Sequence, residues 1–398
     1  MTADSLLNEV RAFAGAFVSQ LGLGEIVAAR RLTGGANNQV YRLECRRESP
    51  GNENLIASPK ASESPSPHPS PPLEERVPDL SAEARRAVVE GRVKGIPEPT
   101  LRTVVLKRYF RSAGDSRDRF GHERAFYSYA HAVGVRRIPD AFGWDDGASL
   151  GALEWLDGSP LQPDDVSDDE VKAALEFFQE LNAGRDHEIA RIIEPGSEAC
   201  FTVADHLDCL GRRVERLMLA GSKQGADAGF RALVDGELVP AWENVRKGIS
   251  AQLLNLDEPL AEGNRCLSPS DFGFHNCLCA SDGSLRFFDF EYSGWDDPAK
   301  TMGDFFSQPR IPVPLKYWDY FLEVLKPLVI DFDMLRHRAQ FLFPAYQLKW
   351  VCIMLNEFMT DDLARREFSD QRPVTRERRE EQLARARFAL HNRTSIDG

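Results

Sequence analysis

Apolar and polar residues alternate along the first part of the chain with two different periods. Apolar side chains three or four positions apart run from residue 5 to residue 21: Leu6, Val10, Phe13, Phe17 and Leu21. This spacing predicts an amphipathic helix. Residues 26–28 and 31–43 follow, with apolar strand positions around a Gly- and Asn-rich turn, and Thr103–Tyr109 is another compact apolar run. These patterns predict the strands of a small sheet.

The helical period dominates the remainder of the chain. Residues 117–133 have apolar positions at one-turn intervals, and short runs at Ile138–Pro139 and 152–156 predict strands. Four later stretches predict helices: 171–182, 203–219, 228–250 with a break at Pro240, and 314 to about 390. A loop and hairpin at 266–297 interrupt them. The expected architecture is α+β, with a small antiparallel-sheet N-lobe over 1–157 and a larger, mainly helical C-lobe over 158–398.

One internal segment lacks any such pattern. Residues 46–99 are rich in Pro and Ser and contain few large apolar side chains, so they bury too little surface to offset chain entropy. We expect residues 48–79 to form a disordered insertion, followed by a short helix at 80–89. The closure cost of a loop grows slowly with its length, so two paired strands tolerate such an insertion.

Composition and charge exclude several classes of function. Of the 398 residues, 42% are hydrophobic, which is ordinary for a globular protein. The formal net charge of −13 argues against nucleic-acid binding. No stretch approaches the roughly 18 apolar residues of a membrane span. Seven scattered cysteines and no export signal indicate reduced thiols in the cytoplasm. Cys277 and Cys279 are the only close pair, and they predict strand residues rather than a zinc site.

Three polar residues in one short segment carry the candidate chemistry. Asp271 precedes Asn276 by five residues, and Asp289 follows that asparagine by thirteen, within an aromatic run. The segment Ser281–Ser284 predicts a hairpin turn that brings Asn276 and Asp289 to the same end of two short strands. Phosphoryl transfer needs a carboxylate that accepts the proton of the attacking hydroxyl, and oxygen ligands that hold Mg²⁺ against phosphate.

This segment resembles the catalytic and metal-binding loops of the aminoglycoside phosphotransferase and choline kinase families, which are relatives of protein kinases. The resemblance implies a bilobal protein-kinase-like fold, with Asp271 as the catalytic base and Asn276 and Asp289 as Mg²⁺ ligands. Glu291 is a further candidate, either as a metal ligand or as a residue behind the ligands. Asp297 and Asp304 also match the pattern and are expected to cap and brace the loops rather than to act on substrate.

The N-terminal half matches the same families in order and in kind. Gly34, Gly35, Asn37 and Asn38 resemble the loop that covers the nucleotide, where small residues let backbone N–H groups approach phosphates. The same residues are common in any hairpin turn, so this signal depends on the downstream motifs.

Lys107 follows three apolar residues and matches the lysine that contacts the α- and β-phosphates. Glu123, sixteen residues later on a predicted helix, is the expected ion-pair partner, although a surface glutamate remains the alternative. Glu154 and Leu156 resemble the connection between the lobes, whose backbone would hydrogen-bond adenine.

Two departures from the family pattern stand near Asp271. Pro269 occupies the position, two residues before the aspartate, where the families usually carry histidine. His275 lies inside the loop and either replaces that histidine or is bonded by the backbone.

These features predict a kinase that moves the γ-phosphoryl group of Mg-ATP to a hydroxyl of a small molecule of the aminoglycoside, amino alcohol or sugar type. Acidic stretches at 196–208 and 361–362 would attract an amine-bearing acceptor, although such stretches are just as often solvated helix faces. A catalytically silent kinase-like regulatory protein, and transfer to a protein hydroxyl, are the alternatives. The sequence carries no signal for an oligomeric state.

Overall fold

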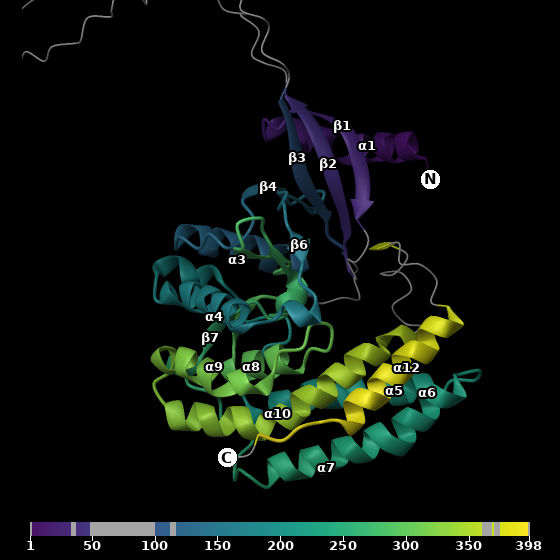
Figure 1. Cartoon of the computed structure of the whole chain (residues 1–398), viewed down its shortest axis with the longest axis vertical. Helices are drawn as coiled ribbons and strands as arrows, with labels where there is room; N and C mark the ends of the chain where they lie inside the picture. Colours follow the sequence, from purple (N-terminus) through teal and green to yellow (C-terminus); the bar gives the residue numbers. More distant parts are fainter. Residues whose placement is uncertain are drawn as a thin grey trace, which may run out of the picture.

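A five-stranded antiparallel sheet comes first and a mainly helical region follows (Figure 1). The computed structural model describes residues 2–32, 37–47, 100–111, 117–359, 368–369 and 375–396. The expected α+β, kinase-like architecture is therefore confirmed. The insertion expected at 48–79 and the helix expected at 80–89 lie outside the described residues.

The sheet has the spatial order β1-β2-β3-β5-β4. Its strands are β1 (Glu25–Leu32), β2 (Gln39–Arg47), β3 (Thr100–Arg108), β4 (Ala141–Asp145) and β5 (Leu150–Glu154). The N-terminal helix α1 (Ala3–Gln20) lies across the sheet, and its apolar side chains form a core with β1, β2, β3 and β5 (Figure 1). This separate small core explains why the first helix has a clear apolar stripe.

The strand expected at Ile138–Pro139 is wrong. The chain there is irregular, and the strand that pairs with β5 begins three residues later, at Ala141. All five residues of β4 are half-buried, so they give no alternation of apolar and polar positions for a sequence pattern to detect. Pro139 cannot donate a backbone hydrogen bond to a ladder.

Helices form most of the remaining structure. They are α3 (Arg119–Ala132), α4 (Asp168–Ala183), α5 (Val203–Ser222), α6 (Ala228–Leu233), α7 (Val239–Ser250), α8 (Pro298–Ser307), α9 (Trp318–Leu325), α10 (Phe332–Met354) and α12 (Arg376–His391). The irregularity expected at Pro240 lies before it: a π-helical turn at Val234–Leu238 separates α6 from α7, and Pro240 lies in the first turn of α7. Proline has no backbone N–H for the regular hydrogen-bond pattern of an α-helix, and the π-helical turn before it departs from that pattern.

Short strands interrupt the helices at the expected place. They are β6 (Ser159–Pro160), β7 (Cys266–Ser268), β8 (Cys277–Cys279), β9 (Leu285–Phe287) and β10 (Gly294–Asp296). Strand β8 pairs with both β6 and β9, and β7 pairs with β10. The link from the sheet to β6 runs through residues 155–158. The division at residue 157 stays a prediction, because α3 precedes it and yet packs in the core of the helical region.

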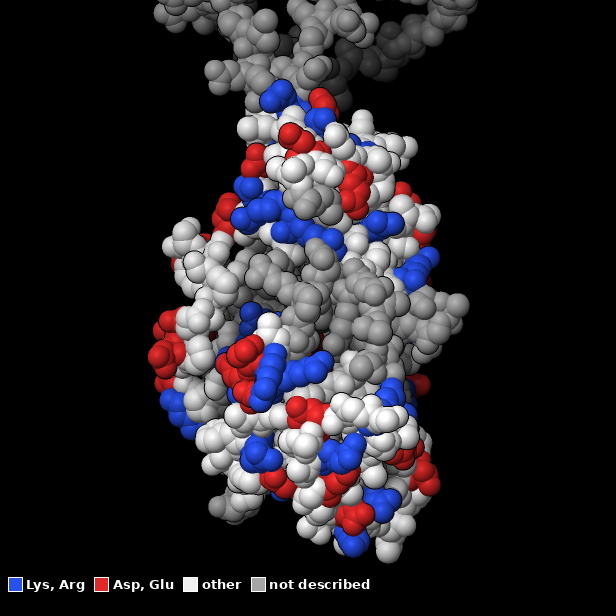
Figure 2. Space-filling model, turned by 90° about the vertical axis from the view of Figure 1, so that its right-hand side faces the viewer, with Lys and Arg blue, Asp and Glu red and all other residues white. Residues whose placement is uncertain are grey.

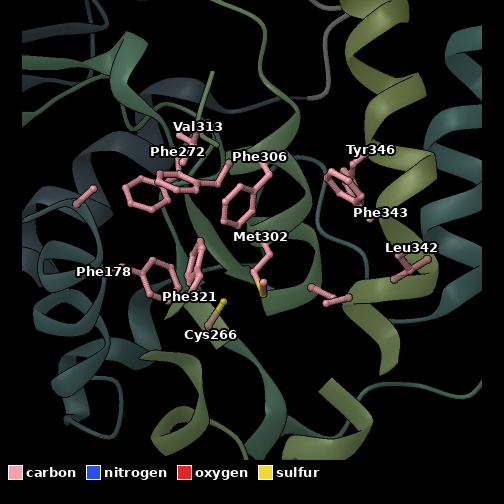
Figure 3. Packing of buried hydrophobic residues seen from close by; sticks show 14 of the residues in the cluster. Phe178, Cys266, Phe272, Met302, Phe306, Val313, Phe321, Leu342, Phe343 and Tyr346 are labelled. Atoms are coloured by element: carbon pink, nitrogen blue, oxygen red, sulfur yellow. The ribbon is translucent and has the colours of Figure 1, made fainter. Parts of the chain in front are cut away.

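Aromatic side chains fill the helical core beside the candidate loop. Phe272 stacks on Phe305 of α8 with ring centroids 4.9 Å apart, and Phe321 of α9 lies 5.3 Å from Phe305. Figure 3 shows Phe272, Phe306 and Phe321 grouped around the centre of this cluster. The residue next to Asp271 is therefore anchored in packed core, which fixes the backbone that carries the carboxylate.

Residues from the C-terminal part of the chain also lie against the sheet. The backbone oxygen of Phe368 accepts hydrogen bonds from Arg31 of β1 at 2.7 Å and from Gln39 of β2 at 2.8 Å. The Phe368 ring lies 5.4 Å from that of Phe110, just after β3. Figure 1 shows this short segment beside the lower ends of the strands. Among the described residues, no helix is both long and apolar enough to cross a membrane.

Candidate active site

A hairpin brings two of the predicted site residues to one place. Cys277 of β8 pairs with Phe287 of β9, and beyond this pair the amide of Phe288 donates to the backbone oxygen of Asn276 at 3.1 Å. At the other end Gly283 has a φ of 83°, a left-handed conformation that glycine adopts without steric cost. The predicted hairpin is therefore present, and Asn276 and Asp289 lie at its open end.

Lys107 of β3 lies at the centre of three carboxylates. Its Nζ is 2.6 Å from Glu123 Oε2, 2.5 Å from Asp289 Oδ1 and 3.5 Å from Glu291 Oε2. Burial lowers the pKa of Lys107, but the three negative charges outweigh burial and raise this pKa well above its usual value. The ion pair predicted between Lys107 and Glu123 is thus present, and Lys107 joins the sheet to the hairpin.

Glu123 holds this arrangement from α3. The side chain is fully buried, and its Oε2 accepts from Lys107 and from the hydroxyl of Tyr109 at 2.7 Å. Its Oε1 accepts from the amide of Phe290 at 3.2 Å. Burial raises the pKa of Glu123 despite the neighbouring ammonium. Tyr109 was not among the predicted site residues, although its place two positions after Lys107 puts it on the same face of the chain.

Glu291 connects the hairpin to the expected nucleotide-covering loop. Asn37 Nδ2 donates to Glu291 Oε1 at 2.6 Å, and Asn38 Nδ2 donates to Glu291 Oε2. The Nε of Arg119 lies 3.8 Å from Glu291 Oε1. Burial, followed by the charge of Asp289, raises the pKa of Glu291 to about 7. Gly34 and Gly35 of the same predicted loop lie outside the described residues.

The carboxylate cluster has the composition of a divalent metal site. Oxygen atoms of Glu123, Asp289 and Glu291 all lie within 4.8 Å of one another. When all three are ionised, Lys107 and Arg119 supply two positive charges, so one net negative charge remains at a largely buried place, which is costly. Hard oxygen donors with this excess charge fit Mg²⁺. Glu123 joins this group, whereas sequence reasoning gave it only the role of an ion-pair partner.

Asp271 is held from both sides by its own loop. His275 Nε2 lies 3.0 Å from Asp271 Oδ1, and Asn276 Nδ2 donates to Oδ2 and to the Asp271 backbone oxygen at 3.0 Å each. Burial raises the pKa of Asp271, but His275 and these hydrogen bonds lower it below its usual value overall. The side chain remains 37% exposed, so an incoming group can reach it. Within the residues that the structure describes, His275 is therefore bonded to the carboxylate and not to backbone.

Buried ion pairs support the loop from behind. Asp297 caps α8 by accepting from the Ala299 amide at 2.7 Å, and its carboxylate also bonds Arg338 at 2.5 Å and His206 at 3.1 Å. These contacts confirm the bracing role expected for Asp297. The second aspartate of this pattern, Asp304, is bound by Lys349 Nζ at 2.8 and 3.0 Å and by the indole nitrogen of Trp350 at 3.0 Å.

The predicted adenine contacts lie at the end of β5. The amide of Glu154 donates to the backbone oxygen of Asp140 at 2.7 Å, and its carboxylate accepts from Arg286 at 2.9 Å. Leu156 follows in the connection to β6. A cavity of about 650 Å³ lies next along the chain and is lined by Asp157–Leu161, Asp165, Glu170 and Cys279–Ser281. The backbone amide of Glu154 is thus already bonded within the sheet. Of the two residues, Leu156 is therefore the better candidate for the predicted backbone contact with adenine.

The acidic stretch at 196–208 has structural tasks. Glu198 pairs with Arg213, and Asp205 caps α5 by accepting from the Phe201 and Thr202 amides. Figure 2 shows acidic and basic side chains interspersed over the helical part of the face that it presents. This stretch therefore gives little support to an electrostatic attraction for amines, and residues 361–362 lie outside the described residues.

No protein-family model and no curated protein matches the sequence. Solved structures do match over nearly the whole chain. Spectinomycin phosphotransferase, solved with ADP and spectinomycin, has a TM-score of 0.52 and 10% identity, covering 98% of this chain and 99% of its own. Choline kinase from Cryptosporidium parvum Iowa II has a TM-score of 0.50 and 11% identity, covering 98% and 95%.

A third structure agrees with these two. Choline kinase from Streptococcus pneumoniae has a TM-score of 0.50 and 11% identity, covering 97% of this chain and 100% of its own. Identities this low are informative about the fold alone. The protein therefore has the fold shared by aminoglycoside phosphotransferases and choline kinases.

Proposed function

We propose that this protein transfers the γ-phosphoryl group of Mg-ATP to a hydroxyl group of a small molecule. The observation that carries the proposal is the meeting of Lys107, Asp289 and Glu291 at the open end of the hairpin that also carries Asn276 and the Asp271 loop. A non-catalytic protein has no physical need for a proton acceptor, a buried lysine and excess carboxylate charge at one place.

Asp271 is the proposed general base. In the step, its carboxylate accepts the proton of the acceptor hydroxyl, whose oxygen forms a bond to the γ-phosphorus. The bond from that phosphorus to the β–γ bridging oxygen breaks, and ADP leaves with the electron pair. The lowered pKa of Asp271 keeps the carboxylate ionised at neutral pH, and its partial exposure leaves room for the hydroxyl.

Lys107 and the neighbouring ligands offset phosphate charge. Bound Mg²⁺ would supply positive charge to the phosphate oxygens. Asn276, Asp289 and Glu291 are the proposed ligands, with Glu123 behind them holding Lys107. The carboxamide of Asn276 already donates to Asp271 through its nitrogen, so its oxygen remains available as a ligand atom. One side chain would thereby connect the proton acceptor with the metal site.

The remaining site residues are proposed to bind the nucleotide. Asn37 and Asn38, with Gly34 and Gly35, would cover the phosphates, since Asn38 directly precedes β2, whose Val40 pairs with Lys107. Leu156 and Glu154 would contact adenine through the backbone of the connection after β5.

The acceptor is proposed to be an aminoglycoside, amino alcohol or sugar. Spectinomycin and choline, named for the structural relatives, are both small hydroxylated molecules that carry basic nitrogen or quaternary ammonium. Their shared chemistry favours such acceptors over a protein hydroxyl.

The test is a screen for ADP production from Mg-ATP with hydroxylated amines, aminoglycosides and sugars as acceptors. We expect Asp271→Asn and Asp289→Asn to lower turnover by at least about 100-fold, because general base and metal ligation each contribute on that order. Asp282→Asn is the matched control, since this exposed aspartate lies in the turn of the same hairpin. Full turnover in both site variants would show that the assignment is wrong.

A measurement of Mg-ATP binding and a set of protein substrates, added to this screen, separate the two alternatives. Mg-dependent ATP binding without ADP production from any acceptor would favour a silent regulatory protein. Transfer only to protein substrates would instead favour the third possibility.

A further inference from the structure

The contact between His275 and Asp271 has no part in the roles proposed above. A general base acts as an ionised carboxylate, which only accepts hydrogen bonds, so in the proposed function His275 Nε2 is the donor to Asp271. With His275 on Oδ1 and Asn276 on Oδ2, each at 3.0 Å, both oxygens of the carboxylate are fixed. Each oxygen keeps a second lone pair that can accept the proton of a hydroxyl.

The imidazole ring is itself held firmly. Its side chain is 10% exposed and lies edge-to-face against Trp350, with ring centroids 6.0 Å apart and planes at 83°. Trp350 is fixed in turn by its bond to Asp304. A Cβ added at Gly273 would lie 2.8 Å from His275 Nδ1, so the absence of a side chain there makes room for the ring.

The ring has a single polar partner. Nδ1 is buried and has no hydrogen bond within the described part of the chain, so Asp271 is the one group there that binds this imidazole. Burying a polar ring nitrogen without a hydrogen bond costs free energy. An apolar ring would fill the same space without that cost. Its position is explained by what it does to Asp271.

We infer that His275 is a positioning residue that holds the carboxylate of Asp271 toward the attacking hydroxyl. The inference rests on the proposed function. A carboxylate that rotates away from the hydroxyl loses productive encounters, and misplacement by about 1 Å can cost about 100-fold in rate. Asn276 alone would fix only Oδ2, whereas the histidine fixes the second oxygen.

The experiment compares Mg-ATP hydrolysis, with water in place of the acceptor, in wild type, His275→Ala and His275→Gln. We expect His275→Ala to lower kcat about 10- to 100-fold and to leave KM for Mg-ATP within about twofold. His275→Gln, whose Nε2 amide can donate to the same oxygen, should recover about a third or more of wild-type kcat. His337→Ala, an exposed histidine on α10, should match wild type.

Equal losses in the alanine and glutamine variants, or full kcat in His275→Ala, would overturn the inference. Asp271→Asn separates this failure from that of the proposed function. If Asp271→Asn and wild type hydrolyse Mg-ATP equally, the proposed function fails and the inference fails with it. If only Asp271→Asn is impaired, the inference alone is wrong.

A spectroscopic measurement tests the bond between His275 and Asp271 without depending on the activity of a variant. In protein labelled with ¹⁵N-histidine, we expect a protonated Nε2 resonance of His275 that shifts in Asp271→Asn, because the acceptor changes from a carboxylate to an amide. An unchanged resonance would show that the two side chains are not bonded in solution, and would overturn the inference without reference to activity.

Discussion

Glu291 is the residue at which burial and neighbouring charge act most clearly in the same direction. Its side chain is 3% exposed and faces Asp289, and both factors favour the protonated form. The amides of Asn37 and Asn38 and the ammonium of Lys107 only partly offset them. The metal-free protein therefore carries a carboxyl group that titrates near neutral pH.

This pKa predicts a pH-dependent difference between wild type and Glu291→Gln. The folded-state pKa of about 7 lies above the value of 4.5 expected for the unfolded chain. Ionisation of Glu291 therefore destabilises the folded state. This free-energy cost is absent below about pH 4.5, increases between pH 4.5 and 7, and is complete above pH 7. Without Mg²⁺, we expect the variant to gain on the order of 3 kcal/mol over wild type between pH 5 and pH 8.

Thermal unfolding at several pH values measures this difference. Glu9→Gln, at an exposed position of α1, is the control and should show no such dependence. A constant difference between the Glu291 variant and wild type across the range would contradict the prediction.

Residues of the site could be predicted where a regular pattern carries them. Lys107 follows three apolar strand residues and Glu123 lies on a periodic helix, so their pairing could be expected from the sequence. Trp350 and its contact His275 are 75 positions apart, and no local pattern connects them. Tyr109 could have been found from its spacing to Lys107, but tyrosine is common on strands and gives no chemical signal alone.

At the scale of elements, helix α8 is held by charges rather than by apolar packing alone. Asp297 caps its first turn and also binds Arg338 of α10 and His206 of α5. Burial raises the pKa of Asp297, but Arg338 and His206 outweigh burial and hold this pKa below its usual value. The carboxylate thus remains charged at neutral pH and connects three helices.

Removal of this carboxylate should be strongly destabilising. Asp297→Ala leaves the buried guanidinium of Arg338 without its partner, and the loss of one member of a buried pair costs about 3–5 kcal/mol. Asp297→Asn keeps an acceptor for the helix cap and should cost less. Urea unfolding measures both, with Asp4→Ala, in the exposed first turn of α1, as a control that should cost below about 1 kcal/mol. Similar losses in all three variants would contradict this account.

Helices and strands could be predicted where their apolar positions recur with a regular period or where a turn residue marks their end. The hairpin from β8 to β9 follows from Asp282-Gly283 between apolar runs, and the break before α7 follows from Pro240. Strand β4 could not be found, because its five half-buried residues show no alternation. The capping task of Asp297 could be expected from its place before Pro298, whereas Arg338 and His206 come from distant helices that no local signal connects.

At the scale of the molecule, the sheet contacts residues from later parts of the chain at more than one place. Residues 155–158 continue from β5, and Phe368 binds β1 and β2 and lies beside Phe110. Phe368 is 337 positions from Arg31 and 329 from Gln39. Such contacts are invisible to sequence patterns, which report neighbours along the chain.

Loss of the Phe368 ring should loosen this link. We expect Phe368→Ala to increase amide hydrogen exchange at the ends of β1 and β2 near Arg31 and Gln39, because the ring contact with Phe110 is removed. Exchange is measured by mass spectrometry on the intact chain. Phe388→Ala, at a 70% exposed position of α12, is the matched control, and an equal effect of both variants would contradict the prediction.

The Phe368 contact has a mechanical consequence. Strands β5 and β1 are separated in the sheet by β3 and β2, so the two attachments lie at different places across one sheet. A sheet attached at one place could rotate freely about that attachment. A second attachment must break, or move with the sheet, before such a rotation can occur. Any swing of the sheet about residues 155–158 must therefore break the two hydrogen bonds of Phe368 or move that segment along with β1 and β2.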